Sequence, residues 1–395
     1  FLLLYAGWSL TTLLWSTWPY GTTNYVLRET TFFAVAMGFF LVFRRRRHWW
    51  HFAVLFLLAA TAASIWQGQA NVIDALSAPD TTVSEAFLKH PFMFANPNFS
   101  AAIVVTAALV AAGIVVVAVH RLRSGSTAGE KNRYLLWIAG CIAATAILLF
   151  TLFTARSLAG YLAVIVATTA YVLCLLPRTA RRLVTAGLTA TLLVACFVVL
   201  YVPSLRRGAI RRAIQPGTTS RARVVWWTAT TDMFVEKPLG GWGAGTYGSA
   251  YYHHSPPLAN EARPTRGVSV THPHNEFLRV AAETGLVGVA LYCAMVGTVL
   301  VGAYRALRTA NFEMRAVGYA LWAGLLGFVT QTALGRGIQI WDLALPYWML
   351  LGTVASTSHW GFTDEKGKMP LDGFARGGAA LAMGGLCLWW WIAGI

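Results

Sequence analysis

The chain has 395 residues, of which 57% are hydrophobic and only 12% are charged, and it contains 17 tryptophans. Apolar runs of the length that a bilayer requires recur along it, so the composition predicts an all-α polytopic membrane protein. The formal net charge of +16 could indicate a nucleic acid partner. However, the basic residues are divided between both predicted membrane faces and no RNA- or DNA-binding module is present, which favours anionic lipids and phosphate groups as partners.

Windows of about 20 apolar residues predict the membrane spans. We expect eleven of them, in a fold of about 11–12 transmembrane helices, near residues 2–18, 28–43, 49–66, 99–120, 134–153, 157–176, 183–203, 285–304, 316–334, 338–358 and 374–395. The printed sequence begins at Phe1 rather than at a methionine, so we expect a further N-terminal piece. Three residues separate the spans on either side of Arg156, which predicts a tight helical hairpin with an arginine at its tip.

Lysine and arginine in short loops are retained on the cytoplasmic side, and alternate loops of this chain are basic. The expected cytoplasmic loops are 44–47, 121–133, 178–182, 305–315 and 359–373. The opposite face then carries 19–27, 67–98, the tip at 154–156, the long segment 204–284 and the turn at 335–337. The chain is thus predicted to have three parts: N-terminal spans over 1–203, a loop over 204–284 and C-terminal spans over 285–395.

The long loop is basic although it is predicted to be extracytoplasmic, which long loops are free to be. One interpretation is that arginines such as Arg206 reach lipid phosphates at the interface. Arg221 and Arg223 favour a functional interpretation instead, because they precede Trp226-Trp227 in a segment with helical periodicity that runs to Glu236. We expect an amphipathic helix there, lying at the membrane interface.

A glycine-rich turn follows this helix at 238–245, with the sequence Pro-Leu-Gly-Gly-Trp-Gly-Ala-Gly. Such a turn can approach a ligand closely and present backbone N–H groups to it. Because it follows a helix in a membrane protein, it does not resemble a dinucleotide fingerprint.

The most informative stretch of the loop is 271–276, with the sequence Thr-His-Pro-His-Asn-Glu. His274 and Asn275 open an apolar-periodic segment, so His274 is expected near a helix N-terminus, where the helix dipole favours the neutral imidazole that can accept a proton. The alternative is that His274 is a helix cap or a surface residue. Glu276 and Glu283 could also serve as the base, but carboxylates beside arginines are better suited to fixing those arginines.

No metal or disulfide framework is predicted. All five cysteines, Cys141, Cys174, Cys196, Cys293 and Cys387, lie inside predicted spans. Neither His253-His254 nor the pair His272 and His274 comes with the carboxylates or cysteines that a stable metal site needs. The sequence therefore predicts chemistry without a metal or another cofactor.

The array resembles the O-antigen ligase and polymerase superfamily, in which polytopic membrane proteins carry one large periplasmic loop. The family signature of His, Asn, nine residues, Gly, two residues and Gly matches His274, Asn275, Gly285 and Gly288. Supporting matches are Asn96-Pro97-Asn98, Thr154-Ala155-Arg156-Ser157, Arg223 before Trp227, and the turn at 238–243. At the hairpin tip Arg156 precedes Ser157, the reverse of the usual family order.

The resemblance implies a membrane glycosyltransferase of the GT-C-like class, in a bacterial inner membrane with its active site facing the periplasm. It implies metal-independent inverting transfer of O-antigen from undecaprenyl pyrophosphate to a sugar hydroxyl of lipid A-core. His274 would be the catalytic base, supported by Asn275, His272, Arg279 and Glu283. The arginines that would hold the pyrophosphate are Arg156, Arg221, Arg223, Arg336 and Arg28.

Two alternatives remain open from the sequence. An O-antigen polymerase or a protein O-oligosaccharyltransferase would use the same donor with another acceptor. A transporter of a lipid-linked glycan would also have many spans and a basic cavity, but it predicts ionisable residues at bilayer depth and internal repeats. Asp342 is the clearest acidic residue within a predicted span and lies close to its end, and no repeat is evident.

Overall fold

The computed structural model describes residues 1–43, 46–77, 97–125, 127–155, 157–201, 207, 219–254, 270–335, 338 and 341–359. The described residues are overwhelmingly helical and contain no strand, which confirms the predicted all-α fold. The first half of the chain forms α1 (Leu2–Thr11), η1 (Thr12–Leu14), α2 (Pro19–Val42), α3 (Arg46–Ser77), α5 (Pro97–Arg123), α6 (Ala128–Ala155), α7 (Leu158–Leu175) and α8 (Arg178–Tyr201). The second half forms α10 (Thr219–Glu236), α11 (Tyr247–His254), α12 (Glu276–Thr309), α13 (Phe312–Leu334), α14 (Trp341–Ser356) and η3 (Thr357–His359).

Seven helices among the described residues are long and apolar enough to cross a membrane, namely α2, α5, α6, α7, α12, α13 and residues Trp49–Trp66 of α3. Two shorter apolar stretches, Leu2–Leu14 and Leu343–Ser356, coincide with two further predicted spans. The span predicted at 183–203 is represented by α8, which is helical from Arg178 but is not among the seven. The span predicted at 374–395 lies outside the described residues.

Most of these helices extend beyond the spans that hydropathy predicts, and α2, α3 and α12 do so by the widest margins. Helix α2 begins at Pro19, so most of the predicted loop 19–27 is its first two turns. Helix α3 continues to Ser77, and α12 begins at Glu276 rather than at 285. Polar residues in these extra turns hide the helix from a hydropathy window, and Pro19 suits a first helical position because its missing N–H needs no partner there.

The helical hairpin predicted around Arg156 is present. Helix α6 ends at Ala155 and α7 begins at Leu158. Ser157 caps α7, because its Oγ accepts a hydrogen bond from the Gly160 N–H at 3.0 Å. Arg156 itself lies outside the described residues.

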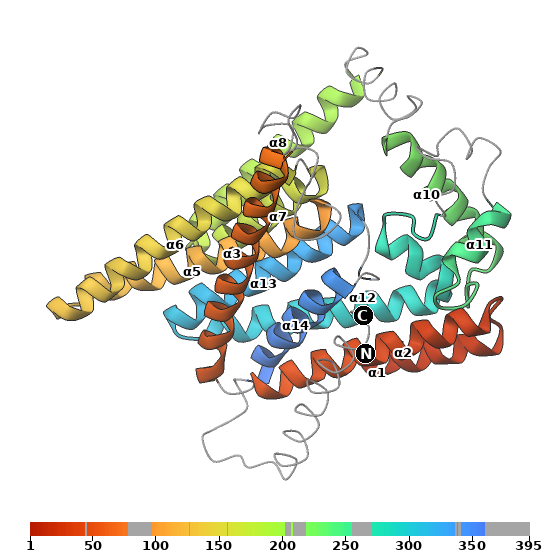
Figure 1. Ribbon diagram of the computed structural model, residues 1–395, viewed down its shortest axis with the longest axis horizontal. Helices are drawn as coiled ribbons and strands as arrows, with labels where there is room; N and C mark the ends of the chain where they lie inside the picture. The colour runs from red at the N-terminus through yellow and green to blue at the C-terminus, as the bar shows by residue number, and fades with distance from the viewer. Residues whose placement is uncertain are drawn as a thin grey trace, which may run out of the picture. The chain divides into compact units, whose positions relative to one another are not determined.

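Contacts divide the chain into two compact units, each built from distant parts of the sequence. The first unit contains residues 1–30, 176–295 and 332–337, and the second contains 31–175, 296–331 and 338–395. Within the second unit α5 packs along α6 and α7, and Figure 1 shows α5 and α6 side by side. All the residues that carry the histidine motif belong to the first unit.

Contacts inside each unit join loops that were predicted to lie on the same face of the membrane. In the second unit Arg121, at the end of α5, pairs with Glu313, at the start of α13, so two loops expected on the same face do meet. In the first unit the Trp15 indole N–H donates to the Gly240 carbonyl oxygen at 3.1 Å, and the Thr17 N–H donates to the Trp242 carbonyl oxygen at 3.2 Å. The end of the first predicted span therefore meets the long loop.

Candidate functional site

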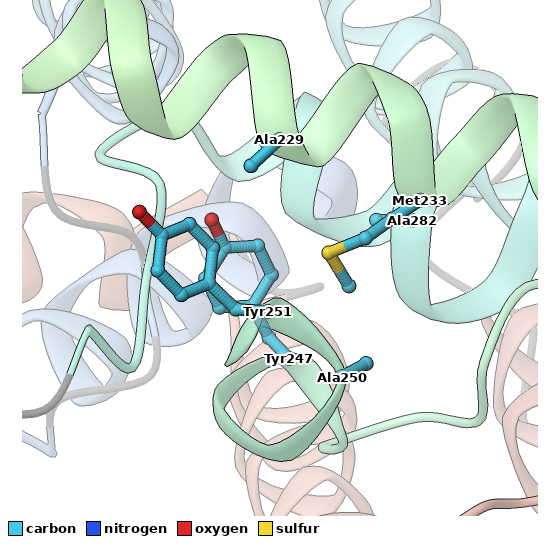
Figure 2. Close-up of a cluster of buried hydrophobic side chains, with 6 residues drawn as sticks. All are labelled: Ala229, Met233, Tyr247, Ala250, Tyr251 and Ala282. Atoms are coloured by element: carbon cyan, nitrogen blue, oxygen red, sulfur yellow. The ribbon is translucent and has the colours of Figure 1, made fainter. Parts of the chain in front are cut away.

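Helices α10 and α11 and the first turns of α12 form one packed scaffold. Figure 2 shows its core, where side chains from the three helices meet: Ala229, Met233, Tyr247, Ala250, Tyr251 and Ala282. The helix predicted over 221–236 is present as α10, and its buried residues Ala229 and Met233 lie one turn apart on the same face. The Tyr247 hydroxyl lies 2.9 Å from Thr230 Oγ1, and burial raises the pKa of this phenol.

The glycine turn at 238–245 docks the scaffold onto α12. The Trp242 and Gly243 N–H groups donate to the carbonyl oxygens of Ala282 and Glu283 at 3.1 and 2.8 Å. The Ala244 N–H donates to Thr12 Oγ1 at 3.0 Å. The expectation that this turn presents its N–H groups to a ligand is therefore wrong for these three groups, because the protein itself uses them.

The docking explains why glycine is needed at Gly285 of the signature and at Gly241 of the turn. Gly285 interrupts the helical geometry of α12 with φ 68° and ψ −170°, and a Cβ there would lie 2.1 Å from the Leu239 carbonyl oxygen. Gly241 has φ 68°, and a Cβ there would lie 2.5 Å from the Glu283 carbonyl oxygen. Backbone meets backbone at both points, so only residues without a side chain fit.

Gly288, the last glycine of the signature, faces another close contact. A Cβ at this position would lie 3.2 Å from Trp8 Cδ1 and closer still to the Thr284 side chain. The Trp8 indole N–H donates to the Thr284 carbonyl oxygen at 2.8 Å, so α1 covers the kink in α12. The spacing between His274 and the two glycines thus reflects the distance from the start of α12 to its docking point.

His272 is buried, with 4% of its surface exposed, and both ring nitrogens are engaged. Its Nδ1 accepts a hydrogen bond from the His274 backbone N–H at 2.8 Å. An accepting Nδ1 carries no proton, so Nε2 carries it and faces Glu276 Oε2 at 3.2 Å. His272 therefore joins the backbone of the turn to the first turn of α12.

The first two turns of α12 carry a buried ion cluster. The Arg279 guanidinium pairs with the carboxylates of Glu276 and Glu283, and it donates to the Tyr25 hydroxyl at 3.1 Å. Glu283 also accepts the Tyr247 N–H at 3.0 Å. All the charged members are almost fully buried, so each depends on its partners for stabilisation. Glu276 and Glu283 both hold the Arg279 guanidinium.

His274 itself is half-buried and has an unusual backbone. Its φ is 56°, the only positive value found at a non-glycine residue in the described part of the chain. Histidine is one of the few residues that visits this left-handed region with any frequency, at a cost of about 1–2 kcal/mol. Asn275 then caps α12, since its Oδ1 accepts the Leu278 N–H at 3.1 Å, so His274 lies at a helix N-terminus as predicted.

Two adjacent tryptophans of α10 hold the histidine turn. The Trp226 ring stacks on the His274 ring, with centroids 4.9 Å apart and planes 16° from parallel. The Trp227 indole N–H donates to the Pro273 carbonyl oxygen at 2.9 Å. Helix α10 therefore contacts both the backbone and the ring of the turn that carries His274.

Two of the arginines expected to bind anions lie on α10. Arg221 and Arg223 are half-buried and precede Trp226 by one to two turns. Partial burial lowers the pKa of the Arg223 guanidinium from its usual range because it removes water from the charge.

Arg28, on α2, has its guanidinium 5.2 Å from the centre of the Tyr25 ring, and its buried Nε has no hydrogen-bond partner. Arg28 therefore reaches toward the same tyrosine that Arg279 contacts. Arg156 and Arg336 lie outside the described residues, so their expected places in the site stay predictions.

Sequence reasoning named Arg28 of α2 but missed Tyr25 and Glu29 on the same helix. Tyr25 bonds Arg279, and Glu29 is 3% exposed with a carboxylate oxygen that has no hydrogen-bond partner. The sequence contained a signal for Glu29, because Arg28 and Glu29 are two adjacent charged residues in an otherwise apolar segment. The sequence analysis did not place Tyr25 and Glu29 in the site because it interpreted the segment before residue 28 as a loop.

No group of three or more histidine, cysteine, aspartate or glutamate side chains that could hold a metal ion occurs among the described residues. Cys141 and Cys293 are free thiols. The polar groups that gather around the histidine turn are instead arginines, glutamates and tyrosines.

The fold and the site together define a class, a multi-pass helical membrane protein with a histidine turn held against a packed polar scaffold. Residues 143–293 match the family model for O-antigen ligase. Over this region the chain is similar to the O-antigen ligase superfamily, as the resemblance indicated, and the match supports a glycosyltransferase-like function of the ligase or polymerase type. The matched segment includes α10, α11, the histidine turn and both signature glycines. No curated protein matches the chain.

Proposed function

We propose that the protein transfers O-antigen from undecaprenyl pyrophosphate to a sugar hydroxyl of lipid A-core, with inversion at the anomeric carbon and without a metal. The observation that carries the proposal is the position of His274, half-buried at the N-terminus of α12, within the family match and on the scaffold that also bears Arg221 and Arg223. We place the site on the periplasmic face of a bacterial inner membrane.

In this reaction His274 accepts the proton of the acceptor hydroxyl as its oxygen attacks the anomeric carbon. The bond between that carbon and the pyrophosphate oxygen breaks, and the lipid pyrophosphate leaves with the bonding electrons. Between the two histidines His274 suits this part, because both ring nitrogens of His272 are occupied in holding the turn. The N-terminus of α12 favours the neutral imidazole that a base requires.

The leaving group is a diphosphate, and guanidinium groups bind such oxygens through paired hydrogen bonds. We assign this binding to Arg221 and Arg223 on α10, with Arg28, Arg156 and Arg336 completing the set. Arg279 takes no direct part in the proposal, because its guanidinium is already shared by Glu276, Glu283 and Tyr25. It supports the site by fixing the first turns of α12.

The assignment of the base is tested with His274→Asn in a reconstituted assay with purified lipid-linked donor. Asparagine tolerates a positive φ but has no basic ring, so we expect the turn to fold and turnover to fall by a factor of roughly 10²–10⁴. His253→Asn, a histidine of α11 outside the turn, is the matched control. Full turnover by His274→Asn would show that another group is the base.

The arginines are tested through the substrate that they affect. Arg221→Gln and Arg223→Gln should raise the KM for the lipid-linked donor more than the KM for the acceptor, because they contact the diphosphate in this proposal. Arg123→Gln, an exposed arginine at the end of α5, is the control. A larger effect on the acceptor would reassign the two side chains to acceptor binding.

The acceptor is tested by offering the purified protein lipid A-core, a second lipid-linked glycan and a pilin-type protein with the same donor. Transfer to lipid A-core alone is expected for a ligase. Transfer to the second glycan would make the protein a polymerase, and transfer to a protein hydroxyl an oligosaccharyltransferase. Movement of donor across liposomes without transfer to any acceptor would favour the transporter.

A further inference from the structure

The ring of His274 is contacted from its own turn and from α10. The left-handed backbone at His274 directs the chain, but the ring still rotates about two side-chain bonds. The His272 ring meets it at 87°, with centroids 6.1 Å apart, whereas the Trp226 ring of α10 stacks on it, with centroids 4.9 Å apart and planes 16° from parallel. The neighbouring Trp227 fixes the carbonyl of Pro273, one residue before the histidine.

We propose that Trp226 is the positioning residue for His274, setting the plane of its ring and stabilising the imidazolium that forms when the ring accepts a proton. This inference rests on the proposed function of His274 as the base. It adds a partner that neither the family signature nor the periodicity of the sequence assigns.

The physical reason lies in two opposing effects on the charge of the ring. The N-terminus of α12 opposes a positive charge on His274, so a base placed there alone would lose driving force as it took the proton. The face of an indole ring attracts a cation within about 6 Å, and it does so more strongly than any other aromatic side chain. Trp226 therefore offsets the helix dipole in the protonated state while leaving the neutral state a base.

Stacking also covers one face of the imidazole and sets the plane of its ring. A ring nitrogen accepts a proton through its lone pair, which lies in the plane of the ring. A fixed ring plane therefore fixes the direction of proton transfer. A misplacement of about 1 Å at a reacting group can lower a rate by roughly 10²-fold. The tryptophan is thus expected to act on the chemical step rather than on substrate binding.

The same helix carries Arg221 and Arg223 before Trp226. If those arginines bind the donor diphosphate, donor binding and base positioning depend on one rigid element. Trp226 packs against the buried core of α10 and α11, which keeps that element from rotating. A helix whose turns serve both substrates of the reaction would align them without a separate hinge.

The test compares Trp226→Leu, Trp226→Phe and the matched control Trp66→Leu, which removes a tryptophan that is 73% exposed on α3. We expect Trp226→Leu to lower kcat by roughly tenfold to a hundredfold with the KM values of donor and acceptor little changed. Trp226→Phe keeps a stacking face and should recover most of the loss. Trp66→Leu should turn over as the unmodified protein does.

A second measurement is independent of activity. Diethyl pyrocarbonate reacts with neutral imidazole nitrogens, and peptide mass spectrometry resolves the modification of His274 from that of His272. Trp226→Leu should raise the modification rate of His274, because one face of its ring is uncovered. The rate of buried His272 should stay low, which shows that the turn is still folded.

The outcomes separate the two proposals. If His274→Asn is inactive while Trp226→Leu matches Trp66→Leu in kcat, the positioning role is wrong and His274 keeps its assignment as the base. If His274→Asn retains turnover, the proposed base is wrong and the role of Trp226 fails with it. Faster modification of both histidines in Trp226→Leu would mean that the tryptophan holds the turn as a whole, which also contradicts the inference.

Discussion

The polar cluster at the start of α12 and the helix interface in the second unit solve the same packing problem with opposite chemistry. The polar cluster, formed by His272, Glu276, Arg279, Glu283 and Tyr25, joins buried groups through charge and hydrogen bonds. The helix interface brings α5, α7 and α13 together through small residues: Gly113 beside Ala316 and Ala320, Gly160 beside Ala101, Gly324 beside Thr106, and Gly327 beside Ala167.

The difference follows from the surroundings of each region. Apolar helices in a bilayer gain little from burying more apolar surface, so they associate by close approach, which small residues allow. The polar cluster precedes the apolar part of α12 and orders a turn that must keep a histidine in a strained conformation. Hydrogen bonds provide the direction that such a turn needs, and close approach alone does not. The two regions should therefore fail in different ways when single residues change.

The largest effect is expected from Arg279→Met. This change leaves Glu276 and Glu283 buried without their shared cation, and removing one partner from a buried ion pair costs about 3–5 kcal/mol. The apparent melting temperature in detergent should fall sharply, as fluorescence-detected size-exclusion chromatography would measure. Arg123→Met, at an exposed arginine of α5, should leave it nearly unchanged. Equal stability of the two variants would mean that the cluster contributes nothing to the fold.

The next effect is expected from Gly285→Ala. A methyl group at this position meets the Leu239 carbonyl oxygen and requires a non-glycine residue at φ 68°, so we expect a loss of about 2–4 kcal/mol. Gly297→Ala, on the same helix with open space around its Cβ, should instead stabilise by about 0.5–1 kcal/mol. Thermal unfolding of both variants measures the contrast. A neutral Gly285→Ala would show that the turn at 238–245 does not dock on α12.

A smaller effect is expected at the helix interface from Gly324→Ala. The added Cβ lies 2.5 Å from Thr106 Cγ2 and must separate α5 from α13, at a cost of about 1–3 kcal/mol. Because the interface is distant from the histidine turn in the chain, His274 should keep its reactivity toward diethyl pyrocarbonate. Gly140→Ala on α6, with nothing near its Cβ, is the control. If only the control lost stability, close approach would not hold these helices.

The smallest effect is expected at His274 itself. His274→Gly relieves the positive φ, whereas His274→Ala keeps the strain and loses the ring, so the glycine variant should be the more stable by about 1 kcal/mol. Melting temperatures of the two variants give the comparison directly. The reverse order would mean that the stacked turn does not hold residue 274 in the left-handed region.

Most of the fold could be predicted from the sequence because it depends on local patterns. Apolar windows predicted the helices, the short gap around Arg156 predicted the hairpin between α6 and α7, and periodicity predicted α10. The start of α2 was placed nine residues late because polar residues such as Thr22 and Asn24 lower the hydropathy of its first turns. Hydropathy reports which residues lie within the membrane, and a helix can continue beyond the residues that do.

For the candidate site, the sequence by itself determined that His274 and Asn275 open a helix and that glycines follow at the signature spacing. Only the tertiary structure decided which distant residues they meet: Arg279 donates to Tyr25 of α2, and Trp226 of α10 covers the ring of His274. The reason is physical. Helix starts, turns and the ion pairs of Arg279 with Glu276 and Glu283 join residues a few positions apart. The stack of Trp226 on His274 and the hydrogen bond from Arg279 to Tyr25 join residues tens or hundreds of positions apart, and no local pattern specifies which of them will meet.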